Sequence, residues 1–397
     1  MLHHLTNLLM SKEILLIPIL ILILLEVKHR IRPISPLKLH FHSWKLTRIN
    51  RDLIIRGLLE IANPHKYMEV MVPEFKISPT LLSNNKLDGI RVRSNVVLNE
   101  ASKETHRKDS YWTNNIVKGH KAAQVELEMT MTTINNYNIS SLWIEIYWVN
   151  YGPFGYLCRR EGVLLPLSHP PLTLSKQAYW HKDENFQTLP VRTHLLGPLD
   201  DPSSVIQYYA GHLLEPGDII AIGETPLAIM QGRFHHPTMV QVSGMARTLC
   251  RFFHPTSSLA TAVGLQTLID IVGPSRVILA WILGITAKIL GIRGVFYRLA
   301  GNQARLIDDL TGTTPPYDQT LVLGPRHSQR ICDQLSREFN ISIAVVDVND
   351  LGKVKILAQS RLYNDTILRR ALKSNPAGNA NEQTPLVLIR PILNCNS

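Results

Sequence analysis

The chain has 397 residues, of which 45% are hydrophobic and 18% are charged. This composition excludes a wholly disordered or low-complexity protein, and the length predicts two domains at about 150 residues each. The formal net charge is +11. Such a charge indicates an anionic partner, namely a nucleic acid, a phosphate-bearing ligand or an acidic membrane. A solvated basic surface without any partner is the alternative.

The four cysteines lie far apart, at Cys158, Cys250, Cys332 and Cys395. Their spacing excludes a zinc-finger type of site and a disulfide framework, and a reducing compartment fits them best. Basic residues are nowhere interleaved with stacking aromatic residues, so we expect no nucleic-acid partner.

An apolar run near the N-terminus, Ile14–Leu25, contains no charge. It is shorter than the roughly 20 residues of a membrane-spanning helix. From Val27 to Arg56 the chain carries eight lysine and arginine residues and one acid, Asp52. Basic residues on this side of a first apolar segment hold that side in the cytoplasm. We expect residues 1–35 to be a short membrane segment with a basic flank, and the bulk of the chain to be cytoplasmic; a buried apolar helix is the alternative.

Residues 36–170 contain strand-like runs such as AAQVELEMTMTTI and SLWIEIYWVNY, separated by turn residues. Apolar and polar residues alternate in these runs with a period of two. The pattern predicts an antiparallel β-sandwich-like domain, and no catalytic spacing stands out within it. We expect a binding or spacer module.

The pattern changes after the proline-rich stretch Pro166–Pro171, and residues 172–397 mix predicted helices and strands. Asp201 precedes a predicted helix over Ser203–His212 as its cap. A buried strand follows and ends at Glu224 and Thr225. The fold class predicted for the whole chain is therefore α+β, with a β-sandwich-like domain followed by a mixed α/β domain.

Four stretches in this second half occur in a distinctive order. They are GDIIAIGETPLAIMQGR (217–233), ARLIDDLTGT (304–313), LVLGPRHSQRICDQLSREFNISIAVVDVNDLG (321–352) and NEQTPLVLIRP (381–391). In content and order they resemble motifs of the coenzyme F420-0:L-glutamate ligase family, which reads GDxxxVxSKxxSKxEGR, GIDxSN, SDTFGR and PVVLVRG. The resemblance covers residues 186–393, about half of the chain.

The resemblance implies an enzyme that uses GTP and Mn²⁺ or Mg²⁺ to join glutamate, through a γ-linked amide, to the deazaflavin precursor F420-0. The relatives are dimers, so a homodimer is implied as well. Asp308 matches the first metal-binding aspartate of the family, and either Asp347 or Asp350 matches the second. Carboxylate oxygens are the ligands that both metals prefer. A capping or turn role for these aspartates is the alternative.

The resemblance also implies a nucleotide site. Its matching positions are Thr193, His194 and Leu195 in a predicted first strand, Glu224, Thr225, Gly232, Arg233, Thr311 and the loop from Gly378 to Thr384. Arg233 would pair with phosphate as a bidentate fork, and an ordinary surface arginine is the alternative.

The chain departs from the family motifs at charged positions. Thr225 and Ile229 stand where the family has two lysines, and NDLGKVK replaces a stretch with a threonine and two arginines; Lys353 and Lys355 offer charge at another spacing. Two functions therefore stay open. The first is a ligase acting on F420-0 or a related phosphate-bearing acceptor, and the second is a non-catalytic, membrane-associated binding or scaffold protein that keeps the ligase fold.

A further segment, RVILAWILGITAKILGIR at Arg276–Arg293, has no counterpart in the family motifs. Its length predicts an amphipathic helix against a membrane surface or a buried core helix, and not a membrane span.

Overall fold

The computed structural model describes residues 35–83, 87, 90–99, 112–132, 139–172, 179–310, 314–348, 352–360, 365–378 and 382–392. The predicted membrane segment up to residue 34 lies outside these ranges, as do Thr311, Asp350 and Cys395. The chain packs as two compact units, one made of residues up to 76, 93–130 and 147–159, and the other of residues 77–92, 131–146 and 160 onwards. The predicted domain division near residue 170 stays a prediction.

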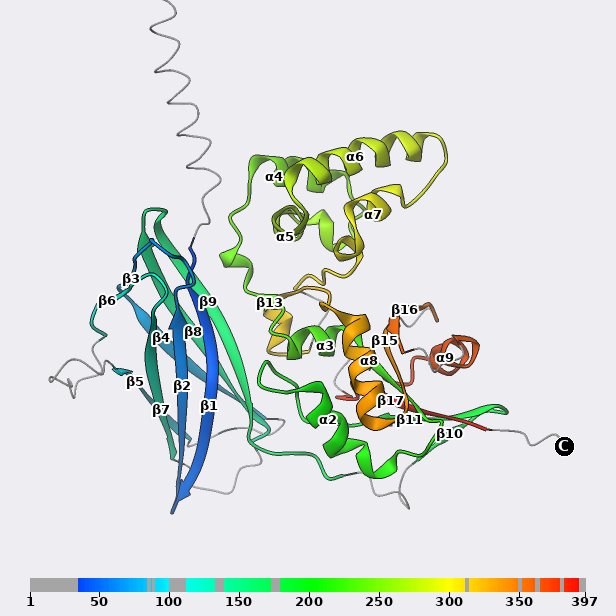
Figure 1. Ribbon diagram of the computed structural model, residues 1–397, viewed down its shortest axis with the longest axis horizontal. Helices are drawn as coiled ribbons and strands as arrows, with labels where there is room; N and C mark the ends of the chain where they lie inside the picture. The colour runs from blue at the N-terminus through cyan, green and yellow to red at the C-terminus, as the bar shows by residue number, and fades with distance from the viewer. Residues whose placement is uncertain are drawn as a thin grey trace, which may run out of the picture. The chain divides into compact units, whose positions relative to one another are not determined.

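The N-terminal part of the described chain consists of antiparallel sheets, as the alternating sequence pattern predicts (Figure 1). Its strands are β1 (Lys38–Ile49), β2 (Asp52–Ala62), β3 (Val70–Val72), β4 (Phe75–Leu82), β5 (Arg91–Asn99), β6 (Asn115–Val117), β7 (Ala122–Thr132), β8 (Ser141–Gly152) and β9 (Gly155–Pro166). One sheet has the order β1-β2-β7-β5, and the other has the order β4-β8-β3-β6 with β9 paired to β8.

Strand β7 illustrates why these residues form a half-buried sheet. Val125, Leu127, Met129 and Met131 are each at most 4% exposed, and the intervening Glu126 and Glu128 are exposed. Because successive side chains of a strand point to opposite faces, this alternation places one face in the core and the other in solvent.

The second half contains a six-stranded mixed sheet of order β10-β11-β17-β12-β15-β16. Its strands are β10 (His181–Lys182), β11 (Phe186–Val191), β12 (Ile219–Gly223), β15 (Ser342–Val348), β16 (Val354–Gln359) and β17 (Leu386–Pro391), and a separate pair joins β13 (Phe234–His235) to β14 (Leu321–Val322). The α-helices are α2 (Pro202–Tyr209), α3 (Glu224–Met230), α4 (Gly244–Leu249), α5 (Ala262–Val272), α6 (Pro274–Ile289), α7 (Val295–Ala300), α8 (Ser328–Phe339) and α9 (Asp365–Leu372). The α+β fold class is therefore confirmed.

Both faces of the six-stranded sheet are covered. In β12, Ile220 and Ile222 join a core with residues of α2, α3 and α8, and Ile219 and Ala221 join another core with residues of α9. A strand buried on both faces needs apolar residues at every position, which explains the continuous run IIAI.

The predicted helix with its aspartate cap corresponds to α2. Asp201 accepts a hydrogen bond from the backbone N–H of Ser204 at 3.0 Å. The helix ends at Tyr209, three residues before the predicted end, and a 3₁₀ turn follows at Gly211–Leu213.

Helices α4 to α7 gather into one group with an apolar core of its own (Figure 1). Within the described residues no single helix has the length and apolarity to cross a membrane. Helices α5 and α6, which meet at a bend of 116°, reach that threshold only as a pair. The helix predicted in the segment Arg276–Arg293 is α6, and only Val277 and Ala280 on it are buried.

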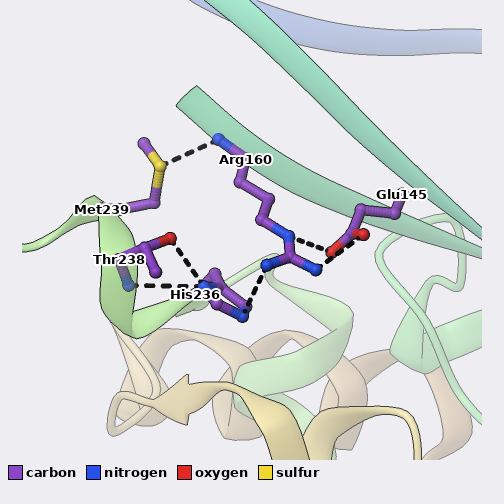
Figure 2. A network of polar contacts seen from close by, with 5 residues as sticks. All are labelled: Glu145, Arg160, His236, Thr238 and Met239. Atoms are coloured by element: carbon purple, nitrogen blue, oxygen red, sulfur yellow. Dashed lines mark hydrogen bonds and ion pairs between the residues drawn. The ribbon is translucent and has the colours of Figure 1, made fainter. Parts of the chain in front are cut away.

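A polar network fixes the chain that leads into this helical group (Figure 2). The guanidinium of Arg160 on β9 donates two hydrogen bonds to the carboxylate of Glu145 on β8 and a third, at 3.1 Å, to Nε2 of His236. Nδ1 of His236 accepts a hydrogen bond from the backbone N–H of Thr238 at 3.3 Å and lies 2.8 Å from its Oγ1. The backbone N–H of Arg160 donates to the sulfur of Met239 at 2.8 Å.

Candidate functional site

A cavity of about 420 Å³ opens beside the mixed sheet and collects most of the predicted site residues. Its wall includes Thr193, His194, Leu195, Glu224, Thr225, Asp308, Asp347, Gly378 and Thr384. Glu224 and Thr225, Asp308, Asp347 and Thr384 come from the four motif stretches, and the other residues come from two further segments, all far apart along the chain. The fold therefore brings together groups that the sequence only places in order.

Glu224 and Asp347 meet because β12 and β15 are parallel neighbours. Gly223 at the end of β12 pairs with Val346 on β15, so Glu224 and Asp347 are the next residues on adjacent strands. The carboxyl ends of parallel strands are the common place for ligand sites in α/β sheets. Glu224 also begins α3, so that the strand end and the helix start share one acidic residue.

Asp308 is held at the cavity by its backbone and by Thr225. Its backbone N–H donates to the carbonyl of Val322 at 2.8 Å, and its carbonyl accepts from the N–H of Val322 at 3.1 Å. The hydroxyl of Thr225 donates to Oδ2 of Asp308 at 3.1 Å. This bond joins the first helical turn of α3 to the stretch 304–313.

Two of the acidic groups at the cavity have raised pKa values. Burial, together with the charges of Asp347 and Asp308 and against the opposing charge of Lys355, raises the pKa of Glu224 to about 9. Burial also raises the pKa of Asp308, and the hydrogen bond from Thr225 partly offsets this rise. Oε2 of Glu224 is buried and has no hydrogen-bond partner. A carboxyl group with this pKa holds a proton at neutral pH.

Lys355 is a site residue whose position the family motif did not predict. Its Nζ lies 3.9 Å from Oδ2 of Asp347, because β16 pairs with β15 and places Lys355 opposite Asp347. The residues after VVDV have the pattern of a second strand that returns in a hairpin, and this pattern could have located Lys355 opposite Asp347.

Thr193, His194 and Leu195 lie in the loop after β11, and the prediction of a strand at these positions was wrong. The ring of His194 is fully engaged: Nδ1 lies 2.8 Å from the hydroxyl of Tyr209, and Nε2 lies 3.0 Å from Oδ1 of Asp200. A carboxylate oxygen only accepts, so Nε2 carries the proton and donates to Asp200, and Nδ1 accepts from the Tyr209 hydroxyl. The ring of His194 therefore holds the loop in shape.

The loop before β17 closes another side of the cavity. The N–H of Thr193 donates to the carbonyl of Gln383 at 2.8 Å, and the hydroxyl of Thr384 donates to the carbonyl of Ala377 at 2.5 Å. Gly378 has φ +69°, and a Cβ there would meet the Glu382 carboxylate at 2.6 Å, so glycine suits this turn.

Gly232 and Arg233 do not line the cavity. Nε of Arg233 donates to the carbonyl of Gly324 at 2.6 Å, and the side chain is buried against Gln303. In this position the guanidinium holds the chain after β14. The nucleotide role predicted for Gly232 and Arg233 stays a prediction, as does the role of Thr311, which lies outside the described residues.

The carboxylates at the cavity supply some, but not all, of the ligands that a divalent cation takes. Across the described ranges no three histidine, cysteine, aspartate or glutamate side chains converge closely enough to ligate one ion. Magnesium is often held by one or two carboxylates together with substrate phosphates, so a full protein cage is not required. An added positive charge would relieve the buried, unpartnered oxygen of Glu224 and the raised pKa values of Glu224 and Asp308. Asp350 lies outside the described residues, so the choice between Asp347 and Asp350 remains open.

The comparisons with known proteins concern the first half of the chain. Residues 38–169 match the family model described as F420-0:gamma-glutamyl ligase, N-terminal Ig-like domain. The match supports a relation to the ligase family through its N-terminal domain, on residues that the motif resemblance did not use. No curated protein matches the chain.

Solved structures give only distant likenesses. The GAE domain of GGA2p from Saccharomyces cerevisiae has 9% identity and a TM-score of 0.21, and the alignment covers 33% of this chain and 99% of that one. The yeast GGA1 GAE domain has 12% identity and a TM-score of 0.19, covering 32% and 99%. A structure titled AvmM Catalyzes Macrocyclization in Alchivemycin A Biosynthesis has 10% identity and a TM-score of 0.20, covering 35% and 93%. Scores this low carry no argument about function.

Proposed function

We propose that the protein is a GTP- and divalent-metal-dependent ligase that forms a γ-glutamyl amide on F420-0 or a related phosphate-bearing acceptor. The observation that carries this proposal is the meeting of Glu224, Asp308 and Asp347 at one cavity. The family match at residues 38–169 supports it independently. The cavity volume lies within the range of about 300–1,000 Å³ that is typical of small-molecule sites.

In this proposal Asp308 and Asp347 supply the carboxylate oxygens for Mn²⁺ or Mg²⁺, and Glu224 stands beside them. A bound metal would supply positive charge that neutralises phosphate oxygens during phosphoryl transfer. Thr225 orients the Asp308 carboxylate through its hydroxyl, and Lys355 offsets the charge of Asp347. The loop from Thr193 to Leu195, fixed by His194, lines the nucleotide end of the cavity.

The test is calorimetric titration of the full chain with GTP, GDP and ATP, each with and without Mn²⁺. We expect metal-dependent binding of guanine nucleotide that Asp308→Asn abolishes. Asp309→Asn is the matched control, because Asp309 is the next residue, does not line the cavity and accepts a bond from the N–H of Leu310. No nucleotide binding by the wild-type chain would contradict the proposal, and equal losses in both variants would contradict the role of Asp308.

The second candidate is a non-catalytic, membrane-associated scaffold protein, and α6 favours it. The outward side of α6 is apolar, with Leu279 at 59% and Ile289 at 80% exposure, and Ile278, Ile282 and Leu283 are also exposed. These positions recur at helical spacing on one side, and within the described residues that side stays in solvent. Residues 244–300 carry six lysine and arginine residues and one acid, Asp270, so the fitting occupant is an anionic bilayer surface.

Vesicle sedimentation with the full chain tests this candidate. We expect binding to vesicles of anionic phospholipid and weaker binding to zwitterionic vesicles, with Leu279→Glu/Ile282→Glu binding less than the wild type. Ile116→Glu is the control, since Ile116 is exposed at 45% on β6. Vesicle binding without any nucleotide binding would favour the scaffold over the ligase. Undiminished vesicle binding by the α6 variant would contradict the docking role of that face.

A further inference from the structure

A second cavity, of about 810 Å³, lies between the helical group and the edge of the mixed sheet. Its wall is formed by the chain before α5, by α7 and the turn that follows it, and by β16 and α9. Ala304, Arg305 and Ile307 in this wall belong to the stretch 304–313.

The lining of this basic cavity has a strong excess of positive charge. Among the described lining residues are Arg305, Lys353, Lys355 and Arg369, against one carboxylate, that of Asp347. Clefts lined by charges of one sign concentrate the electrostatic field and attract ligands of opposite charge.

Two of the basic side chains, Arg369 and Arg305, have defined contacts among the described residues. Nη1 of Arg369 donates a hydrogen bond to the carbonyl of Val354 at 2.8 Å. The guanidinium of Arg305 lies 5.8 Å from the ring centre of Tyr297, whose hydroxyl is 3.0 Å from Oγ of Ser257. A guanidinium has five N–H donors in a planar fork that matches a phosphate group.

The basic cavity adjoins the first cavity, which holds Glu224 and Asp308, through Asp347, which lines both. Lys355 also lines the basic cavity and approaches Asp347 within 3.9 Å. If the anionic end of a ligand lies among the arginines, its other end extends towards the carboxylates of the first cavity, where the amide bond would form. The chain has Thr225 and Ile229 where the family motif has lysines, and it gathers its positive charge in this second place instead.

We propose that the basic cavity binds the phosphate group of the acceptor substrate, with Arg305, Lys353 and Arg369 as its recognition residues. The inference rests on the proposed ligase function and adds to it the position and the chemistry of acceptor recognition. Both a free phosphate ion and a phosphate on an organic acceptor have this chemistry, and the experiment separates them.

The probes are flavin mononucleotide, riboflavin and inorganic phosphate, each titrated into the full chain in EDTA so that no metal site contributes. Binding of a flavin is followed by the quenching of its fluorescence. We expect flavin mononucleotide to bind at least about tenfold more tightly than riboflavin, which lacks the phosphate. The variant Arg305→Gln/Lys353→Gln should lose this preference. The control Lys45→Gln/Arg48→Gln removes the same charge from exposed positions on β1 and should retain it.

Two outcomes overturn the inference. Equal binding of flavin mononucleotide and riboflavin, together with no binding of inorganic phosphate, means that the cavity recognises no phosphate. Binding of inorganic phosphate alone means that the cavity holds a free anion and no acceptor. Failure of the ligase proposal is distinguishable, because Asp308→Asn should abolish binding of GTP with Mn²⁺ and leave the phosphate preference intact.

Discussion

The hydroxyl of Thr225 donates to the carboxylate of Asp308 at 3.1 Å, across 83 residues of sequence. One partner begins α3 directly after a central strand, and the other lies in a backbone pairing with Val322. A hydrogen bond to a carboxylate favours its ionised form, so Thr225 counteracts the rise that burial causes in the pKa of Asp308. The contact favours the ionised carboxylate of Asp308, which is the form that ligates a metal ion, inside a partly desolvated cavity.

Thr225→Val should weaken binding of Mn²⁺ at pH 7 by about tenfold, since the pKa of Asp308 rises further when this bond is lost. The deficit should shrink as the pH rises, because the carboxyl ionises in any case. Calorimetric titration at pH 6.5 and pH 8.5 measures both effects. Thr286→Val is the control, as its hydroxyl bonds only to carbonyls of its own helix, of Ile282 and Leu283. A similar loss in the control, or a deficit that is independent of pH, would refute the role of the bond.

Glu224→Gln should stabilise the fold, and more so at higher pH. The pKa of Glu224 is about 9 in the folded protein against 4.5 for an unperturbed side chain. Between these values the folded state keeps a proton that the unfolded state has released. The free energy of unfolding of the wild type therefore falls as pH rises, by at most about 1.4 kcal/mol per pH unit from this group. Glutamine has no such titration, so the advantage of the variant should grow from pH 5 to pH 8.5.

Urea unfolding at pH 5, 7 and 8.5 measures this difference. Glu184→Gln provides the control, because Glu184 is exposed in the turn between β10 and β11. If the difference in stability between Glu224→Gln and wild type stayed constant with pH, the raised pKa would be refuted.

Metal binding should release protons. Glu224 holds a proton at pH 7, and carboxylates must be ionised to stand beside a divalent cation. We expect release of about one proton per Mn²⁺ at pH 7 and a rise in affinity with pH up to about 9. Titrations in buffers of different ionisation enthalpy count the protons directly. Glu224→Gln should bind Mn²⁺ with far less proton release, and unchanged release in that variant would assign the proton to another group.

The alternating pattern predicted the strands of the first half well wherever one face is continuously buried, as in β7 and β8. The predicted period of two begins near His40, inside β1, but no individual run was assigned to this strand, in which the pairing with β2 shifts between Phe41 and Trp44. A shift of this kind interrupts the alternation of faces, so the period of two disappears from the sequence although the strand continues. Such an irregularity depends on the partner strand and is invisible in one strand alone.

The site was predictable to the extent that its residues end strands or belong to family motifs. Glu224, Asp308 and Asp347 were predicted and do line one cavity. Lys355 was considered as a source of charge at a different spacing, and its place opposite Asp347 follows from the pairing of β16 with β15. The locking of His194 by Tyr209 and Asp200 was also unforeseen, since it requires α2 to pack back on the loop after β11.

At the opposite end of β12 from Glu224, Asp218 and Arg390 form a buried bidentate pair. Nε of Arg390 donates to Oδ1 of Asp218 at 2.9 Å and Nη2 donates to Oδ2 at 2.8 Å, and the Asp218 side chain is 1% exposed. The hydrogen bonds to Asp218 raise the pKa of Arg390. Arg390→Met would leave the carboxylate buried without a counter-charge, so we expect a loss of about 3–5 kcal/mol in the free energy of unfolding.

Chemical denaturation checks this loss, with Arg56→Met as the control. Arg56 pairs with Glu128 at 2.7 Å in an exposed ion pair, so its replacement should cost less than about 1 kcal/mol. The double variant Asp218→Asn/Arg390→Met should recover part of the stability, because the unpaired charge is then absent. Equal costs in the Arg390 and Arg56 variants would mean that the buried pair contributes no more than a surface pair. Since the pair lies at the far end of the strand from the acids, the folded fraction of Arg390→Met should still bind Mn²⁺ with wild-type affinity.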